Sequence, residues 1–157
     1  MALRPVRTVG DPILRRPTSE VDPSRLGSSE MTTLIRDMTD TVLDEKGLGI
    51  AATQIGSNHR IAVINGQDGT YAVINPRIIK RSIRTETDEE GCLSIPDVFG
   101  LVKRAKSVTV TFLDVDGKAH REKASGLLAR VYQHEIDHLD GILFIDRMKK
   151  ITKGTLP

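Results

Sequence analysis

Apolar side chains recur with helical spacing in one early segment of the chain. Between Ser28 and Glu45 they fall at positions 31, 34, 35, 38, 42 and 43, which places them on one face of a helix. Ser28 is a residue type that caps helix N-termini, and Gly47 follows the last apolar position. The pattern predicts an amphipathic helix that packs against the core.

The middle of the chain changes to short runs of β-branched residues, separated by turn residues. We predict strands at residues 60–64, 70–76, 77–83 and 107–114. The dipeptide Asp116-Gly117 follows the last run and is typical of a hairpin turn, which would join that run to the residues around His120. The sheet is therefore expected to be partly antiparallel.

A second helical pattern follows Gly126 and ends at Gly141. Four side chains share one face of this helix: Leu127, Val131, His134 and His138. We expect residues 142–146 to form a strand or an extended segment, and residues 149–157 carry no clear pattern. Helices packed on a mixed, largely antiparallel sheet define an α+β fold.

Length and composition narrow the class of protein. The length is usual for one domain, and no repeat or linker divides residues 1–157. A formal charge of +2, from 23 basic and 21 acidic residues, gives no strong field, so we expect no sequence-specific recognition of nucleic acid, although a local basic patch could still contact it. Cys92 is the only cysteine, which excludes an internal disulfide, and no apolar stretch approaches the ~18 residues of a membrane span. We expect a soluble, cytoplasmic protein with no membrane attachment.

The stretch QHEIDH is a candidate metal site. Side chains four apart stack on a helix, so His134 and His138 can reach one ion while Glu135 lies beside it. An imidazole on an apolar face carries a desolvation cost unless a partner satisfies it, and a metal is one such partner. The alternative is a helix with two surface histidines. His59 and His120 have no motif around them, and we expect both to be ordinary surface residues.

Two further stretches could contribute to a site. A catalytic metal usually takes three protein ligands, and EGCLSIP offers Cys92, although a lone cysteine is more often a small buried apolar residue. The stretch GLGIAATQIG at 47–56 lacks the Lys-Ser/Thr of a phosphate loop and the third glycine of a dinucleotide motif, which excludes both. Its simplest interpretation is a tight turn between a helix and a strand.

Taken in order, GLGIAATQ, EGCLS and QHEIDH resemble the three motifs of the peptide deformylases, and the resemblance extends from GDPILR to ILFIDRM. The resemblance implies an α+β fold with mixed, largely antiparallel sheets packed around a central helix that carries the His-Glu-x-x-His metal motif. It also implies an activity: removal of the N-formyl group from the initiator methionine of newly synthesised polypeptides, with release of formate. The partners would be N-formylmethionyl nascent peptides.

The resemblance further implies a metal centre. Its ligands would be Cys92, His134 and His138, with a water in the fourth position, since a thiolate and two neutral imidazoles bind a divalent ion well. The native ion of the family is typically Fe2+. Zn2+, Ni2+ or Co2+ can take its place, because ligand chemistry alone does not favour iron over these ions.

Roles for the other motif residues follow from the same resemblance. Glu135 would act as general base and then general acid. The side-chain amide of Gln54 and the backbone N–H of Leu93 would stabilise the oxyanion that forms on the formyl carbonyl. The backbone at Leu48 and Gly49 would bind the extended peptide, and an apolar pocket would hold the methionine side chain.

The chain departs from many bacterial members of the family in two places. Only residues 139–157 follow the motif helix, where those members have a longer helix linked to ribosome docking, so a transient ribosome contact is in doubt. Val98 and Phe99 follow EGCLSIP where some members carry a basic residue, which predicts a more apolar rim like that of the organellar and cyanobacterial branch. A bacterial, organellar or phage source stays open.

Two other functions compete with deformylation. A metallopeptidase that cuts internal peptide bonds usually takes its third ligand downstream of the His-Glu-x-x-His motif, where little of the chain remains. A non-catalytic metal-binding or chaperone-like module needs neither Glu135 nor Gln54 as a catalytic group, and both residues are present.

Overall fold

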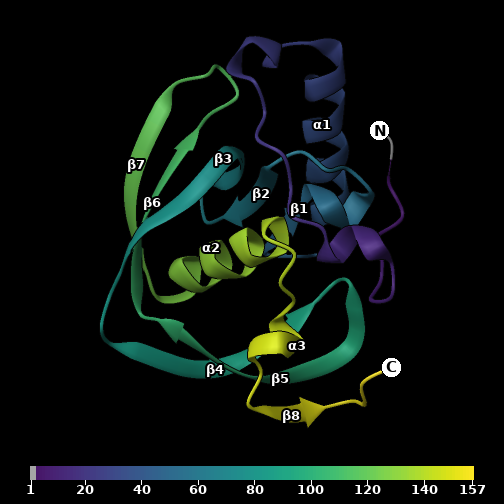
Figure 1. Cartoon of the computed structure of the whole chain (residues 1–157), viewed down its shortest axis with the longest axis vertical. Coiled ribbons are helices and arrows are strands. Elements are labelled where there is room, and N and C mark those ends of the chain that lie inside the picture. Colours follow the sequence, from purple (N-terminus) through teal and green to yellow (C-terminus); the bar gives the residue numbers. More distant parts are fainter. Residues whose placement is uncertain (1–2) are drawn as a thin grey trace.

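The computed structural model describes residues 3–157 and has an α+β architecture with antiparallel sheets (Figure 1). The larger sheet has the spatial order β1-β2-β3-β6-β7. Its strands are β1 (Gly49–Ala51), β2 (Ile61–Gly66), β3 (Gly69–Arg81), β6 (Ser107–Leu113) and β7 (Ala119–Ser125). Neighbouring strands pair in antiparallel fashion, and the pairing of Phe112 with His120 confirms the predicted hairpin.

The strands predicted at 70–76 and 77–83 are one continuous strand, β3, so the division between them was wrong. The register of β3 against β6 shifts between Ile74 and Arg77, which is the signature of a bulge around Pro76. Asn75 has a φ of 51°, and its side chain bonds the backbone of Val21 in both directions, at 2.8 and 2.9 Å. The proline therefore bends the strand without ending it.

A second sheet has the order β4-β5-β8, and none of its three strands was predicted. Its strands are β4 (Thr85–Cys92), β5 (Ile95–Ala105) and β8 (Lys150–Lys153). The first five residues of β4 are exposed, so this strand carries no apolar alternation that a sequence pattern could reveal. β8 lies in the segment that showed no clear pattern.

Both predicted helices are present. The first, α1 (Ser29–Asp44), begins where the Ser28 hydroxyl accepts the N–H of Met31, and the second, α2 (Gly126–Leu139), carries the motif histidines. The prediction of an extended segment at 142–146 was wrong in its second half, because α3 (Phe144–Arg147) is a short helix. Asp146 starts this helix by accepting the N–H of Leu143 at 2.9 Å. Short 3-10 turns lie at Pro12–Arg15, Pro23–Arg25 and Ala52–Ile55.

Both faces of the larger sheet are buried at β2, which explains the continuous apolar run of this strand. Ile61 and Val63 pack in one cluster with residues of α1, whereas Ala62 and Ile64 pack in another with residues of α2. Figure 1 shows α2 between the larger sheet and the β4-β5-β8 sheet. The chain thus places α2, with its histidines, against the strand end that carries Cys92.

The predicted apolar rim at residues 98 and 99 is half correct. Val98 is buried in a third cluster with Leu14 and Phe144, so it lines no rim. Phe99 is half-buried and borders the cavity described below. Among residues 3–157, no helix has the length and apolar character needed to cross a membrane.

Candidate active site

Three predicted metal ligands meet at one point. Cys92 is the last residue of β4, and His134 and His138 lie one turn apart on α2. One ligand atom from each of the three lies within 4.8 Å of the other two, and Cys92 Sγ is 3.2 Å from His138 Nε2. The two imidazole rings are 5.0 Å apart between centroids. Residues 46 positions apart in sequence therefore form one compact cluster.

The cluster fits a divalent ion. A thiolate with two imidazoles is a donor set for borderline-soft metals such as zinc, iron, cobalt and nickel. Beside it, Oε2 of Glu135 is buried and has no hydrogen-bond partner among the described residues. A buried carboxylate oxygen without a partner is costly, and a water on a bound ion would satisfy it.

Charges within the cluster favour the thiolate form of Cys92. Burial alone would raise the pKa of the thiol, but His138 and His134 outweigh burial and hold that pKa well below its usual value. Burial likewise opposes the charged form of His134, yet Cys92 and Glu90 raise its pKa well above the usual value. Metal binding releases a proton from such a pair, because the ligands are the thiolate and the neutral imidazole.

A buried carboxylate orients one of the ligands. Nδ1 of His134 lies 2.8 Å from Oε1 of Glu90. Burial would raise the pKa of Glu90, but His134 and Arg104 lower it far below the usual range, so the group is an ionised acceptor. In the neutral imidazole that binds a metal, Nδ1 therefore keeps the proton and Nε2 is left free to face the cluster.

Two arginines hold this carboxylate in place. Arg104 on β5 bonds both oxygens of Glu90 at 2.9 Å, and Arg130 on α2 donates to Oε2 at 2.6 Å. Arg130 also donates to the carbonyl oxygens of Glu86 and Val102, which ties α2 to both β4 and β5. The side chain of Glu90 is thus fixed from two sides.

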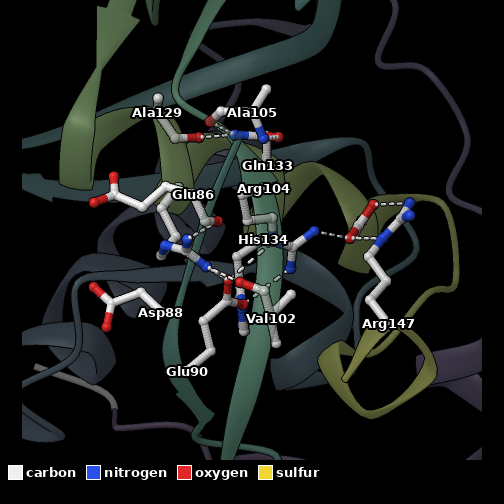
Figure 2. A network of polar contacts seen from close by, with 12 residues as sticks. Glu86, Asp88, Glu90, Val102, Arg104, Ala105, Ala129, Gln133, His134 and Arg147 are labelled. Atoms are coloured by element: carbon white, nitrogen blue, oxygen red, sulfur yellow. Dashed lines mark hydrogen bonds and ion pairs between the residues drawn. The ribbon is translucent and has the colours of Figure 1, made fainter. Parts of the chain in front are cut away.

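The same network continues to the surface. Arg104 donates to Asp137 at 2.5 Å, and Arg147 on α3 bonds both oxygens of Asp137 at 2.6 and 2.9 Å. Figure 2 shows these contacts between Arg147 and His134, with Arg104 in the middle. Gln133 anchors α2 nearby through the N–H and C=O of Ala105.

Sequence reasoning did not find this network. Glu90 and Asp137 lie inside the quoted motifs, but their charge was given no role. Nothing in the sequence marks Arg104 as a partner, because it meets Glu90 only through the pairing of β4 with β5.

Glu135 and Gly49 are in close contact. Glu135 is only 4% exposed, and burial raises the pKa of its carboxyl. A Cβ atom built on Gly49 would lie 2.8 Å from Oε1 of Glu135. The backbone of β1 approaches the carboxylate so closely that only glycine fits without movement.

Gln54 faces the cluster from the 3-10 turn after β1. Its Oε1 accepts the N–H of Ala51 at 2.8 Å, which leaves Nε2 as the end that points toward Cys92 Sγ at 3.7 Å and Ser94 Oγ at 3.1 Å. Leu93 follows Cys92 directly and borders the cavity described in the next paragraph. The interpretation of residues 47–56 as a simple turn was incomplete, since this stretch contains both β1 and the Gln54 turn.

These residues border one cavity of about 530 Å³. Its apolar lining comes from six side chains: Leu48, Leu93, Pro96, Phe99, Leu127 and Val131. Its volume is in the range of pockets that take a drug-sized ligand or a short peptide. All the residues predicted for the site, apart from the deeper His138, line this cavity.

The expectation for the two remaining histidines was wrong in part. Both are half-buried, and His59 bonds Ser57 at 2.9 Å. His120 stacks on Phe112 with ring centroids 5.1 Å apart and bonds Asp114 at 2.7 Å. His120 is a packed residue of the β6-β7 hairpin.

Comparison with known proteins identifies the family. The sequence pattern described as polypeptide deformylase matches residues 3–154. The chain is 48% identical to a peptide deformylase of Thermomicrobium roseum, over 95% of this chain and 88% of that protein. It is 43% identical to one of Dictyoglomus thermophilum, over 98% and 97%. The chain belongs to the polypeptide deformylase family.

A solved structure agrees with this assignment. The class I type b peptide deformylase of Acinetobacter baumannii, solved with Met-Ala-Ser bound, superimposes with a TM-score of 0.90 at 34% identity, over 94% of this chain and 99% of that one. The protein is thus an enzyme of the peptide deformylase class, as the three motifs predicted.

Proposed function

We propose that the protein is a metal-dependent hydrolase that removes the formyl group from the N-formylmethionine of newly synthesised polypeptides and releases formate. The observation that carries this proposal is the meeting of Cys92, His134 and His138 beside the buried Glu135, within a chain of this family.

In this proposal, Cys92, His134 and His138 hold one divalent ion, natively Fe2+, for which Zn2+, Ni2+ or Co2+ can substitute. When bound, the ion acts as a Lewis acid that activates water and polarises the formyl carbonyl. Glu90 keeps His134 in the ligating tautomer through the 2.8 Å bond to Nδ1.

Glu135 moves the protons. Burial raises the pKa of its carboxyl toward neutral pH, which suits a group that must take up a proton and release it again. Oε2, which has no other partner among the described residues, would accept the proton of the attacking water. The same oxygen would then deliver it to the leaving amine nitrogen.

Gln54 and Leu93 stabilise the oxyanion. The bond from the Ala51 N–H to Oε1 supports this role, because it fixes Nε2 as the donor end that faces the cavity. The backbone N–H of Leu93, next to Cys92, would supply the second donor. Loss of one such donor typically lowers turnover by ~100- to 1000-fold.

The edge of the larger sheet binds the peptide. β1 is the terminal strand of its sheet, so the backbone at Leu48 and Gly49 can pair with an extended chain. The apolar side chains of Leu127 and Val131 border the same cavity and suit a methionine side chain. The Met-Ala-Ser held by the similar Acinetobacter structure supports a substrate that begins with methionine.

A mass-spectrometric product assay tests the function. Freshly metallated protein is incubated without oxygen with formyl-Met-Ala-Ser, and we expect loss of the formyl group and release of formate. Glu135→Gln, loaded with the same metal, is expected to bind peptide but not to turn over. Internal fragments would indicate a peptidase instead, and an unchanged peptide would refute the catalytic role.

A further inference from the structure

A second cavity adjoins the catalytic one and has no role in the proposed chemistry. It has a volume of about 800 Å³ and lies between the β2-β3 hairpin, strands β6 and β7, and the first turns of α2. We call it the hairpin groove. Its apolar lining includes Ile64, Tyr71, Phe112 and Val131.

The hairpin groove and the catalytic cavity share part of their lining. Leu48, Leu127 and Val131 line both. Leu48 and Leu127 are large apolar side chains that are 50% and 61% exposed, and the neighbouring Leu128 is 37% exposed. A ridge of exposed leucines between two cavities is typical of a surface that binds a chain passing over it.

The acidic side chains that line the groove indicate which kind of molecule can bind there. Three carboxylates line it, those of Asp68, Asp114 and Glu122, and the described residues that line it include no lysine or arginine. Asp114 is paired with His120 at 2.7 Å, which leaves Asp68 and Glu122 as the lining carboxylates without an ion-pair partner among the described residues. The groove is locally acidic on a chain whose net charge is +2. It complements a basic, partly apolar chain and repels an anionic membrane surface.

The volume of the catalytic cavity also indicates that a longer polypeptide would reach the groove. The catalytic cavity, at about 530 Å³, holds a short peptide such as the tripeptide of the similar structure. A nascent polypeptide continues beyond that point at ~3.3–3.6 Å per extended residue. The leucine ridge offers such a chain an apolar path into the groove.

We propose that the hairpin groove binds the substrate polypeptide beyond its third residue and favours basic side chains there. This inference rests on the proposed deformylation, because the occupant is the continuation of the chain whose formylated end lies in the catalytic cavity. The groove would make long basic substrates better than short ones through a lower KM, with kcat unchanged.

The experiment compares three formylated peptides. They are formyl-Met-Ala-Ser, an octapeptide that continues it with lysine and leucine in alternation, and the same octapeptide with glutamate in place of lysine. The wild-type protein is expected to process the lysine octapeptide with the highest kcat/KM and the glutamate octapeptide with the lowest. The lysine preference should decrease as salt is added.

Two variants and a control locate the effect. Asp68→Asn with Glu122→Gln removes two groove carboxylates and should lower kcat/KM for the lysine octapeptide by about two- to fivefold per carboxylate. Leu128→Ser should lower it for both octapeptides. The matched control Asp44→Asn removes an exposed carboxylate at the end of α1 and should leave all three peptides unchanged. None of these variants should alter kcat for the tripeptide.

The outcomes separate the two proposals. The groove proposal is overturned, while deformylation stands, if the wild-type protein has equal kcat/KM for the tripeptide and both octapeptides. It is also overturned if the groove variants lower kcat/KM for the tripeptide as much as for the octapeptides. The groove could instead be covered by a second copy of the chain. In that case the wild-type protein would show no lysine preference and would sediment as a dimer, and Leu128→Ser would abolish the dimer. This result would also overturn the proposal. Failure of all three peptides to lose formate overturns deformylation and the groove with it.

Discussion

Replacing Gly49 by alanine tests whether the close approach of β1 to Glu135 matters for turnover. The added methyl group would lie 2.8 Å from Oε1, 2.9 Å from Cγ and 3.0 Å from Cδ of Glu135. Comfortable contacts of carbon atoms are about 3.5–4.0 Å, so the carboxylate or the strand must move by roughly 0.5–1 Å. Glu135 is only 4% exposed, which leaves it little room to do so.

The displacement should lower both the turnover and the stability of the protein. A misplacement of ~1 Å in a catalytic group can cost about 100-fold, so we expect kcat for formyl-Met-Ala-Ser to fall by about 10- to 100-fold. Overpacking of this kind typically costs about 1–3 kcal/mol of unfolding free energy. The metal dissociation constant should change by less than about twofold, because the ligands come from β4 and α2 and not from β1.

The assay is steady-state deformylation, with metal content and urea unfolding measured on the same preparation. Gly66→Ala is the matched control: it lies in the neighbouring strand β2, its Cβ would be 3.3 Å from the Tyr71 ring, and it does not border the catalytic cavity. We expect this control to retain kcat within about twofold on the tripeptide. A Gly49→Ala protein with wild-type kcat would refute the reasoning, as would one that loses its metal.

Three further predictions concern the ligands and the carboxylate behind them. Glu90→Gln should weaken metal binding by about 10- to 100-fold in a chelator competition, and an unchanged dissociation constant would contradict the orienting role of Glu90 on His134. Metal removal should expose a reactive thiolate at Cys92. Iodoacetamide should therefore alkylate Cys92 at neutral pH at least about tenfold faster in metal-free than in zinc-loaded protein, as measured by mass spectrometry. Equal alkylation rates would argue against Cys92 as a ligand. The pKa of Glu90 is lowered in the folded state from its usual 4.5, so its contribution to stability is present above about pH 4.5 and is lost as the pH falls below that value, where the unfolded chain takes up the proton first. Urea unfolding of metal-free protein between pH 3 and 6 should show this decline, and Glu90→Gln should show a shallower one.

Local patterns predicted the elements whose signal is local. The helix from Ser29 to Asp44 and the helix from Gly126 to Leu139 follow from apolar spacing and caps, and the β6-β7 hairpin follows from Asp116-Gly117 after a β-branched run. β4 escaped prediction because its first five residues are exposed and polar and are held as a strand by pairing with β5. α3 escaped because a four-residue helix depends on the capping contact of Asp146 and on burial of Phe144.

The residues of the site likewise differ in how far the sequence predicted them. The sequence by itself determined that His134, Glu135 and His138 share one end of a helix, because that spacing is a property of the helix alone. The sequence also offered Cys92 as a candidate third ligand, but only the resemblance of its motif to a known family assigned it to the metal.

Only the tertiary structure decided the rest. The pairing of β4 with β5 and their packing on α2 bring Cys92 to the histidines and Arg104 to Glu90. The approach of β1 to Glu135 and the groove beside the leucine ridge likewise arise between segments distant in sequence. Such contacts depend on strand register and on the packing of whole layers, and a one-dimensional pattern carries no record of either.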